Sequence, residues 1–392
     1  MRKYDLVIVG GGLVGSALAL ALRGSGLKVA LVEAVSRSAD SHPSYDDRTL
    51  ALALASVRLI KKLGLWDALS SKVTAIQRIV VSASKQLVRT RLESKEQHLP
   101  EFGHVVYAKD LGLAMQSALE HEEDIKSFCP SEVTGFEYKA ESAHVFLTHG
   151  NGEQETISCK LIVGADGADS FIRQQLGLKA QQFDYQRSAI ITNVTPEKPH
   201  QNTAYEHLTE TGPMALLPIT QNRCGLVWVT KTEHQQTLLD MSDEQFIQKA
   251  QKRLSYPLGR ITRCGKRFAY PLRLSYAREQ IAERALLMGN AAHAIAPVSA
   301  QGFNLGLRDA MQLAQLLLDE APGSDIGDMA ILQKYQDLRR EDQSNIVQWT
   351  DTLMRAFSNP SSMVKYARAG VMLGINLSGT ARKKVTHLAM GL

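Results

Sequence analysis

The sequence predicts an α/β fold in which a doubly wound parallel sheet carries an inserted, mostly antiparallel β-sheet domain and a helical C-terminal segment. Near the N-terminus, two apolar runs rich in β-branched residues flank a glycine-interrupted stretch of alanines and leucines. This strand–helix–strand order is typical of a Rossmann-like domain. From about Phe183 to Leu274 the chain shows short β-rich runs separated by turn residues. Beyond about Arg340 the pattern becomes helical.

The first strand and helix are joined by a glycine motif. Tyr4–Val9 is apolar and suited to a buried strand, and Gly10, Gly12 and Gly15 then form G-x-G-x-x-G. Such glycines permit a tight turn, a close approach of the backbone to a pyrophosphate, and close packing of helix on strand. The helix, predicted to run to about Arg23, offers free N–H groups at its N-terminus to the same pyrophosphate.

An acidic residue ends the second strand. The strand Lys28–Val32 leads to Glu33, roughly 20 residues beyond the glycines. A carboxylate at this point accepts hydrogen bonds from a ribose 2′-hydroxyl and repels a 2′-phosphate. Strand, glycines, helix, strand and acid in this order predict a site for an ADP moiety, and they leave FAD and NAD equally open.

The uncharged stretch between Asp5 and Arg23 also suits a signal peptide or a membrane anchor. Three successive glycines interrupt it, however, whereas the apolar part of a signal peptide runs on to a cleavage site. Each glycine would weaken a spanning helix by about 1 kcal/mol relative to alanine. No later apolar run approaches the roughly 20 residues that a span needs. The dinucleotide interpretation is therefore favoured.

Composition excludes several classes. With 44% hydrophobic and 22% charged residues and a net charge of +5, the chain is neither disordered nor strongly basic, and no block suggests nucleic acid. The four cysteines are far apart, without a C-x-x-C pair or a zinc-like cluster. We therefore expect reduced thiols in a cytoplasmic protein and no metal site.

Two later stretches repeat the pattern of a strand followed by polar residues. The strand Lys160–Val163 precedes Asp166, and the strand Ala285–Met288 precedes Gly289 and Asn290. Open α/β sheets bind ligands at such strand ends. Asp166 is therefore a candidate for cofactor contact, and its alternative role is that of a turn former.

These three stretches, together with "DDRTLALALASVRLIKKLGLWDAL" and "FGHVV", resemble the FAD-dependent aromatic hydroxylases of the p-hydroxybenzoate hydroxylase type. The likeness extends to about Arg340 and is sharpest for the branch acting in ubiquinone biosynthesis. It implies a glutathione reductase-type FAD-binding domain. The first motif would hold the ADP half of FAD, the Asp-Gly motif is associated with FAD and NAD(P)H, and the third motif touches the ribityl chain and the flavin. "GPMALLPI" and "RCGLVW" are similar to the hydroxylases of 2-polyprenyl-6-methoxyphenol.

The resemblance implies further cofactor-binding residues. The family has an arginine near the flavin phosphates where Arg48 stands, although Arg48 also suits a surface pair with Asp46 or Asp47. In the third motif the candidates are Gly289, Asn290, Pro297, Gly302 and Asn304. A proline-bounded loop before an ordinary helix is the alternative for the last three.

The chain departs from the family at two points. Gly289-Asn290 replaces the usual Gly-Asp, and the amide can hydrogen-bond a ribityl hydroxyl but carries no charge. Ala300-Gln301-Gly302 replaces Gly-Gln-Gly, and alanine adopts positive φ less freely than glycine. Either change would loosen flavin binding.

The implied reaction is hydroxylation of the ring of a polyprenylated phenol, with NAD(P)H and O2, through a C4a-hydroperoxide of the flavin. Because no second nucleotide motif is present, NAD(P)H would bind only transiently. N–H groups of a helix that begins near Gly302 would stabilise the reduced flavin. His293 is interpreted as a packed histidine that supports the loop, and no catalytic residue is assigned.

Other functions stay open. Oxidases, reductases of isoprenoid chains and halogenases share the fold, but the halogenase signature W-x-W-x-I-P is absent at Trp228. The two motif departures also keep open a non-catalytic FAD-binding scaffold subunit of a quinone-synthesis complex.

The predicted domains are discontinuous. The FAD-binding domain takes residues 1–75, 104–182 and 275–345, and the substrate sheet takes 76–103 and 183–274, with one helix that begins at the capping pattern of Ser242. Tyr205, His207, Arg223 and Trp228 are candidates to face the substrate.

The C-terminal segment 346–392 mixes apolar and basic residues. An amphipathic helix there would rest peripherally on the inner face of a membrane that holds a lipophilic substrate. Packing on the flavin domain, or on a partner subunit of a homo-oligomer, is the alternative.

Overall fold

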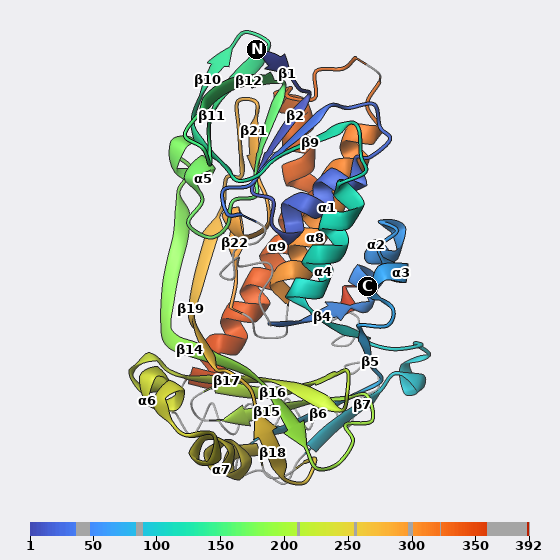
Figure 1. Ribbon diagram of the computed structural model, residues 1–392, viewed down its shortest axis with the longest axis vertical. Coiled ribbons are helices and arrows are strands. Elements are labelled where there is room, and N and C mark those ends of the chain that lie inside the picture. Colours follow the sequence, from blue (N-terminus) through green and yellow to red (C-terminus); the bar gives the residue numbers. More distant parts are fainter. Residues whose placement is uncertain are drawn as a thin grey trace.

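The computed structural model describes residues 1–36, 48–83, 89–209, 212–254, 257–296, 301–321, 323–358 and 390–391. Figure 1 shows two parts joined by long strands. The upper part holds a parallel sheet and its helices, and the lower part holds a broad antiparallel sheet. The strands β14 (Ala180–Pro196) and β19 (Phe268–Ala277) run from one part into the other. Pro297 and Ala300, and most of the predicted C-terminal segment, lie outside the described residues.

The parallel sheet has the strand order β20-β21-β13-β2-β3-β9. Only β20 (Ile281–Ala282) pairs antiparallel. The other strands are β2 (Leu6–Val9), β3 (Val29–Val32), β9 (Ile125–Phe128), β13 (Leu161–Gly164) and β21 (Ala285–Leu287). Their residues are almost all fully buried, as expected for strands covered on both faces. The strands predicted near residues 4, 28, 160 and 285 are confirmed, with shifts of one or two residues at their ends.

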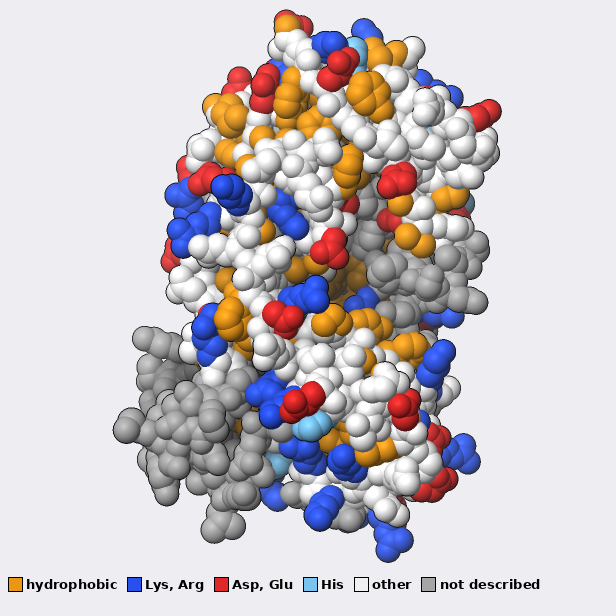
Figure 2. Space-filling model, turned by 90° about the vertical axis from the view of Figure 1, so that its left-hand side faces the viewer, with side chains coloured by type: hydrophobic (Ala, Val, Ile, Leu, Met, Phe, Trp, Pro, Cys, Tyr) orange, Lys and Arg blue, Asp and Glu red, His pale blue; other side chains and the backbone are white. Residues whose placement is uncertain are grey.

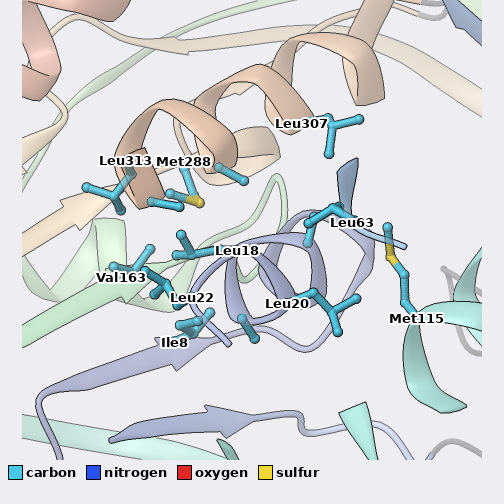
Figure 3. Close-up of a cluster of buried hydrophobic side chains, with 14 of the residues drawn as sticks. Ile8, Leu18, Leu20, Leu22, Leu63, Met115, Val163, Met288, Leu307 and Leu313 are labelled. Atoms are coloured by element: carbon cyan, nitrogen blue, oxygen red, sulfur yellow. The ribbon is translucent and has the colours of Figure 1, made fainter. Parts of the chain in front are cut away.

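Alternate residues of β2 enter two different cores. Leu6 and Ile8 pack among helices α1 (Leu13–Ala21), α4 (Ala108–Leu119) and α8 (Gln301–Leu318). Figure 3 shows Ile8 and Val163 close to Leu18 and Leu22 on this side. Burying each side chain of this size stabilises the fold by about 1.5–3 kcal/mol relative to leaving it exposed.

The second core lies against a four-stranded sheet. Val7 and Val9 pack there with residues of β10 (Ser131–Lys139), β11 (Ser142–His149) and β12 (Gln154–Cys159), and β1 (Arg2–Lys3) completes the sheet. This layer was not anticipated, although the alternation of buried and exposed residues along β11 is a strand pattern.

The large sheet has the order β22-β19-β14-β17-β16-β15-β6-β7, with β18 beside β14. Neighbours pair antiparallel except β15 with β6, so the mostly antiparallel prediction is confirmed. The strands not yet bounded are β6 (Arg78–Ala83), β7 (Arg89–Glu93), β15 (Thr203–Thr209), β16 (Gly212–Ile219), β17 (Arg223–Lys231), β18 (Ile261–Cys264) and β22 (His293–Ala294). A three-stranded sheet of β4 (Thr49–Ala53), β8 (Gly103–Tyr107) and β5 (Thr74–Ile76) carries α2 (Leu54–Lys62) and α3 (Trp66–Leu69).

Two helices, α6 (Gln235–Asp240) and α7 (Asp243–Leu254), interrupt the large sheet, so the prediction of one helix is wrong. The capping pattern before α7 is confirmed: Ser242 Oγ accepts from Gln245 N, and Gln245 Oε1 accepts from Ser242 N. Trp228 and Phe246 pack in the core between the sheet and α7.

The long helix α9 (Met329–Ser358) packs beside α8 and continues toward the large sheet. Among the described residues, no helix has both the length and the apolar character needed to cross a membrane. The chain end returns to the small sheet, where Met390 is buried beside Leu54 and Phe102. The domain boundaries given above stay a prediction.

Candidate functional site

The glycine turn sits at the carboxyl end of β2. Gly10 has φ +105°, and a Cβ added there would lie 2.4 Å from the Ala165 carbonyl oxygen. A Cβ on Gly15 would lie 2.0 Å from the Gly10 carbonyl oxygen. Gly12 is the N-cap of α1, and no side chain caps that helix. The first-turn N–H groups therefore fit the pyrophosphate of a dinucleotide.

Glu33 lies directly beside this turn. Its Oε2 accepts a hydrogen bond from Gly11 N at 2.7 Å, and its Oε1 accepts one from Val35 N at 2.8 Å. Each carboxylate oxygen has a second lone pair, so Glu33 can also accept from a ribose hydroxyl. The structure thus brings together Glu33 and the glycine motif, as the spacing in the sequence predicts.

Asp166 follows β13, next to the residue that Gly10 contacts. Its carboxylate accepts hydrogen bonds from Ser170 Oγ and from Ile172 N, at the start of α5 (Phe171–Gln175). Asp166 therefore shapes the turn before α5, and its contact with a cofactor stays a prediction.

The third motif folds against α1. Gly289 adopts φ +56° and lies against Val14, while Asn290 is exposed. His293 is fully buried, and its Nε2–H donates to Asp309, which also accepts from Arg339 Nε at 2.7 Å. Burial alone would raise the pKa of Asp309, but His293 and Arg339 outweigh it and hold that pKa well below its usual range. His293 thus ties its loop to α8.

The start of α8 is pinned to β4. The Asn304 side chain accepts from Ala53 N and donates to the Ala51 carbonyl oxygen, both at 2.9 Å. The Asn304 amide thus fixes the start of α8 against β4, and its contact with the flavin stays a prediction. A Cβ on Gly302 would meet only Ile295, at 3.7 Å, so packing among the described residues does not require glycine there.

Arg48 lies between the two parts of the molecule. Its guanidinium carbon is 4.9 Å from the centre of the Tyr270 ring on β19. It lines a pocket of about 320 Å³ together with Arg223, Arg263 and Lys266. Sequence reasoning missed the last two cations, because spacing alone does not bring β18 to Arg48. Asp46 and Asp47 lie outside the described residues.

The candidates on the large sheet divide between its faces. Tyr205 and Trp228 pack in the core under α7, and His207 Nδ1 hydrogen-bonds with Ser82 Oγ at 2.8 Å. Tyr205 and His207 share one face of β15. Their side chains, like that of Trp228, point away from the FAD-binding part. Of the four candidates, Arg223 lies on the opposite face.

A family model described as the FAD binding domain matches residues 3–350. The chain belongs to this family. It is an FAD-dependent aromatic-ring monooxygenase, and such enzymes use NAD(P)H as reductant and O2 as oxidant. FAD is consequently the dinucleotide cofactor, and its binding by Gly10, Gly12, Gly15 and Glu33 stays a prediction.

Relatives match along the whole chain. The ubiquinone hydroxylase UbiL of Rhodospirillum rubrum is 33% identical over 100% of this chain and 90% of its own length. The 3-demethoxyubiquinol 3-hydroxylase of Escherichia coli is 29% identical over 100% of this chain and 99% of its own. Among solved structures, the p-nitrophenol 4-monooxygenase of Pseudomonas putida superposes with a TM-score of 0.81 at 17% identity, covering 98% of this chain and 97% of that one. The predicted fold class is confirmed.

Proposed function

We propose that this FAD monooxygenase hydroxylates the aromatic ring of a polyprenylated phenol, of the 2-polyprenyl-6-methoxyphenol type, in ubiquinone biosynthesis. The observation that carries the proposal is the end-to-end similarity to relatives named as ubiquinone hydroxylases, at 33% and 29% identity. The substrate is consequently expected to be lipophilic and electron-rich.

Some residues of this chain would bind the cofactor, and others would exclude water from the reacting groups. Gly10 to Gly15 and the start of α1 bind the pyrophosphate, and Glu33 binds the ribose. Bound FAD supplies the redox chemistry with NAD(P)H and O2, and the protein supplies orientation. Val227 and Ile191 pack against an apolar cluster on one face of the large sheet, and this cluster would exclude water from the reacting ring.

Substrate-stimulated turnover tests the proposal. NAD(P)H oxidation by the purified yellow protein is followed with and without a short-chain prenyl methoxyphenol, while product mass and peroxide are recorded. Faster oxidation with a product that gains one oxygen atom is the expected result. Peroxide release without product would indicate an oxidase.

A scaffold subunit is the second candidate, and the Gly289-Asn290 and Ala300-Gln301-Gly302 departures favour it. A flavin-loaded protein that neither accepts electrons from NAD(P)H nor responds to any phenol would replace the hydroxylase with this scaffold. Pull-down of other quinone-synthesis enzymes would then be the assay of choice.

A further inference from the structure

One transverse row of side chains crosses the large sheet from β6 to β14. Residues directly opposite each other on neighbouring strands share a face of the sheet. Val81 pairs with Glu206, Glu206 with Ala215, Ala215 with Val227, and Val227 with Ile191. Glu206 is therefore the one ionisable residue in a row of otherwise apolar side chains.

This row faces the FAD-binding part. Val227 and Ile191 pack against a hydrophobic cluster that includes Ala296, which lies within the third motif. On β17, two residues before Val227 and hence on the same face, a Cβ added to Gly225 would lie 2.6 Å from Thr49 Oγ1 of β4. The row thus looks toward the elements that carry the flavin motifs.

The side chains of the row are only partly buried, whereas those on the opposite face, such as Trp228 and Met214, are completely buried. Partial exposure at an inward-facing surface means that the row borders accessible space. Figure 2 shows the molecule hollowed at mid-height on one side, with hydrophobic side chains inside the hollow. The row itself is apolar apart from Glu206, so it offers a surface compatible with an aromatic ring of a substrate.

Glu206 is at odds with its apolar neighbours. Among the described residues, none donates a hydrogen bond to its carboxyl group or pairs a cation with it, and burial is what raises its pKa, to about 7. Val81 and Ala215, directly beside it, have no polar side-chain atoms to offer. An unpaired carboxyl group in such surroundings is unfavourable for stability, which points to a partner that arrives from outside the chain.

We propose that Glu206 accepts a hydrogen bond from the phenolic hydroxyl of the substrate. This inference rests on the proposed function. A phenol entering an apolar pocket needs an acceptor for its O–H, and a carboxylate provides a stronger bond than a neutral acceptor. Because the carboxylate attracts the phenolic proton, the phenolic oxygen becomes more electron-rich and donates more density to the ring. A more electron-rich ring favours transfer of an electrophilic oxygen to it.

The test compares a phenol with its methyl ether. At pH 8, above the pKa of Glu206, a short-chain prenyl methoxyphenol and the same compound with the hydroxyl methylated are titrated into the FAD-loaded holoenzyme, and the change in flavin absorbance gives each Kd. We expect the wild type to prefer the phenol about tenfold or more, because the ether has no proton to donate. In Glu206→Gln the amide can donate to the ether oxygen, so the preference should fall toward unity.

A matched variant tests whether the loss of preference for the phenol is specific to position 206 or follows from any Glu→Gln change. Glu132→Gln makes the same change at an exposed site on β10, and it should keep the wild-type preference. If Glu206→Gln does not hold FAD, Glu206→Asp is titrated instead. Its acceptor is withdrawn by one methylene, so phenol binding should weaken while ether binding does not.

The outcomes distinguish the two proposals. A wild-type protein that hydroxylates the phenol, with Glu206→Gln retaining the full preference, overturns the role of Glu206 and leaves the hydroxylase intact. A wild-type protein that binds neither compound, and whose NAD(P)H oxidation neither compound stimulates, overturns the proposed function and the role of Glu206 with it.

Discussion

At the scale of single residues, two glycines of the flavin motifs differ in what they require. A Cβ on Gly15 collides with the Gly10 carbonyl oxygen, whereas a Cβ on Gly302 makes an ordinary contact with Ile295. We expect Gly15→Ala to destabilise the fold by about 1–3 kcal/mol, through the shift this collision forces, and to lower FAD content. Gly302→Ala should retain FAD. The ratio of absorbance at the flavin and protein bands, with the unfolding temperature, measures both, and equal FAD loss in the two variants would contradict the prediction.

A second residue-scale prediction concerns pH. Burial raises the pKa of Glu206 from 4.5 to about 7, and Val81 and Ala215 beside it are neutral. The folded state therefore holds this proton more tightly than the unfolded state. Its stabilising effect is complete below about pH 4.5 and is lost as the pH rises through 7. Glu206→Gln should consequently raise the free energy of unfolding at pH 8, by about 1 kcal/mol for a partly exposed group, and leave it unchanged near pH 4.5.

The pH prediction has an internal control. Glu132→Gln, at an exposed position, should show no such pH-dependent difference when unfolding is followed in parallel at both pH values. A Glu206→Gln protein that is less stable than the wild type at pH 8 would mean that the carboxylate has a stabilising partner.

At the scale of elements, a buried ionic chain joins the third flavin motif to two helices. Asp309 on α8 bonds to His293 and to Arg339 on α9, and Arg339 also donates to Asp342 at 2.6 Å. Asp309→Asn leaves Arg339 partly unpaired in a buried place, which we expect to destabilise the fold by about 3–5 kcal/mol. Because the third motif is tied to this chain, FAD content should fall as well. Thermal unfolding and bound FAD are the measurements.

The same substitution at an exposed residue just after α8 serves as its control. Asp319→Asn affects an exposed carboxylate whose side-chain partner among the described residues is Gln315, and it should change neither quantity measurably. If Asp309→Asn unfolds at the wild-type temperature, the ionic chain does not stabilise the contact between α8 and α9.

Elements were predicted well where the signal is local. The capping pattern in the sequence predicts the start of α7, and Ser242 and Gln245 form the expected reciprocal hydrogen bonds. Helix α6 was missed because it has six residues, too few to repeat an apolar period. The sheet formed by β10, β11 and β12 was not predicted, because these strands carry no nucleotide motif and tertiary packing sets which strands pair.

At the scale of the whole molecule, the C-terminal segment either rests on a membrane surface or packs on protein, and a shortened chain distinguishes the two. We expect a chain that ends at Asn359 to bind anionic liposomes more weakly while it retains FAD, because it loses basic and apolar residues suited to a membrane surface. Liposome co-sedimentation and FAD content measure this. Met390→Ala in the full chain is the control, since Met390 packs against Leu54 and its loss alone should leave liposome binding unchanged. Unchanged liposome binding by the shortened chain would remove the peripheral-membrane interpretation.

The sequence by itself determined the geometry of the glycine turn and of Glu33 beside it, since Gly10, Gly12, Gly15 and Glu33 belong to one strand–helix–strand unit that local spacing sets. The sequence also indicated the antiparallel sheet, because runs of β-branched residues separated by turn residues predict its strands. Only the tertiary structure decided that His207 faces the outer core and Glu206 the flavin side, because alternation defines two faces of a strand without saying which one packs where. It likewise decided the pairing of Arg48 with Tyr270 and of Asp309 with Arg339, because such contacts depend on how distant elements pack and leave no periodic trace in the chain.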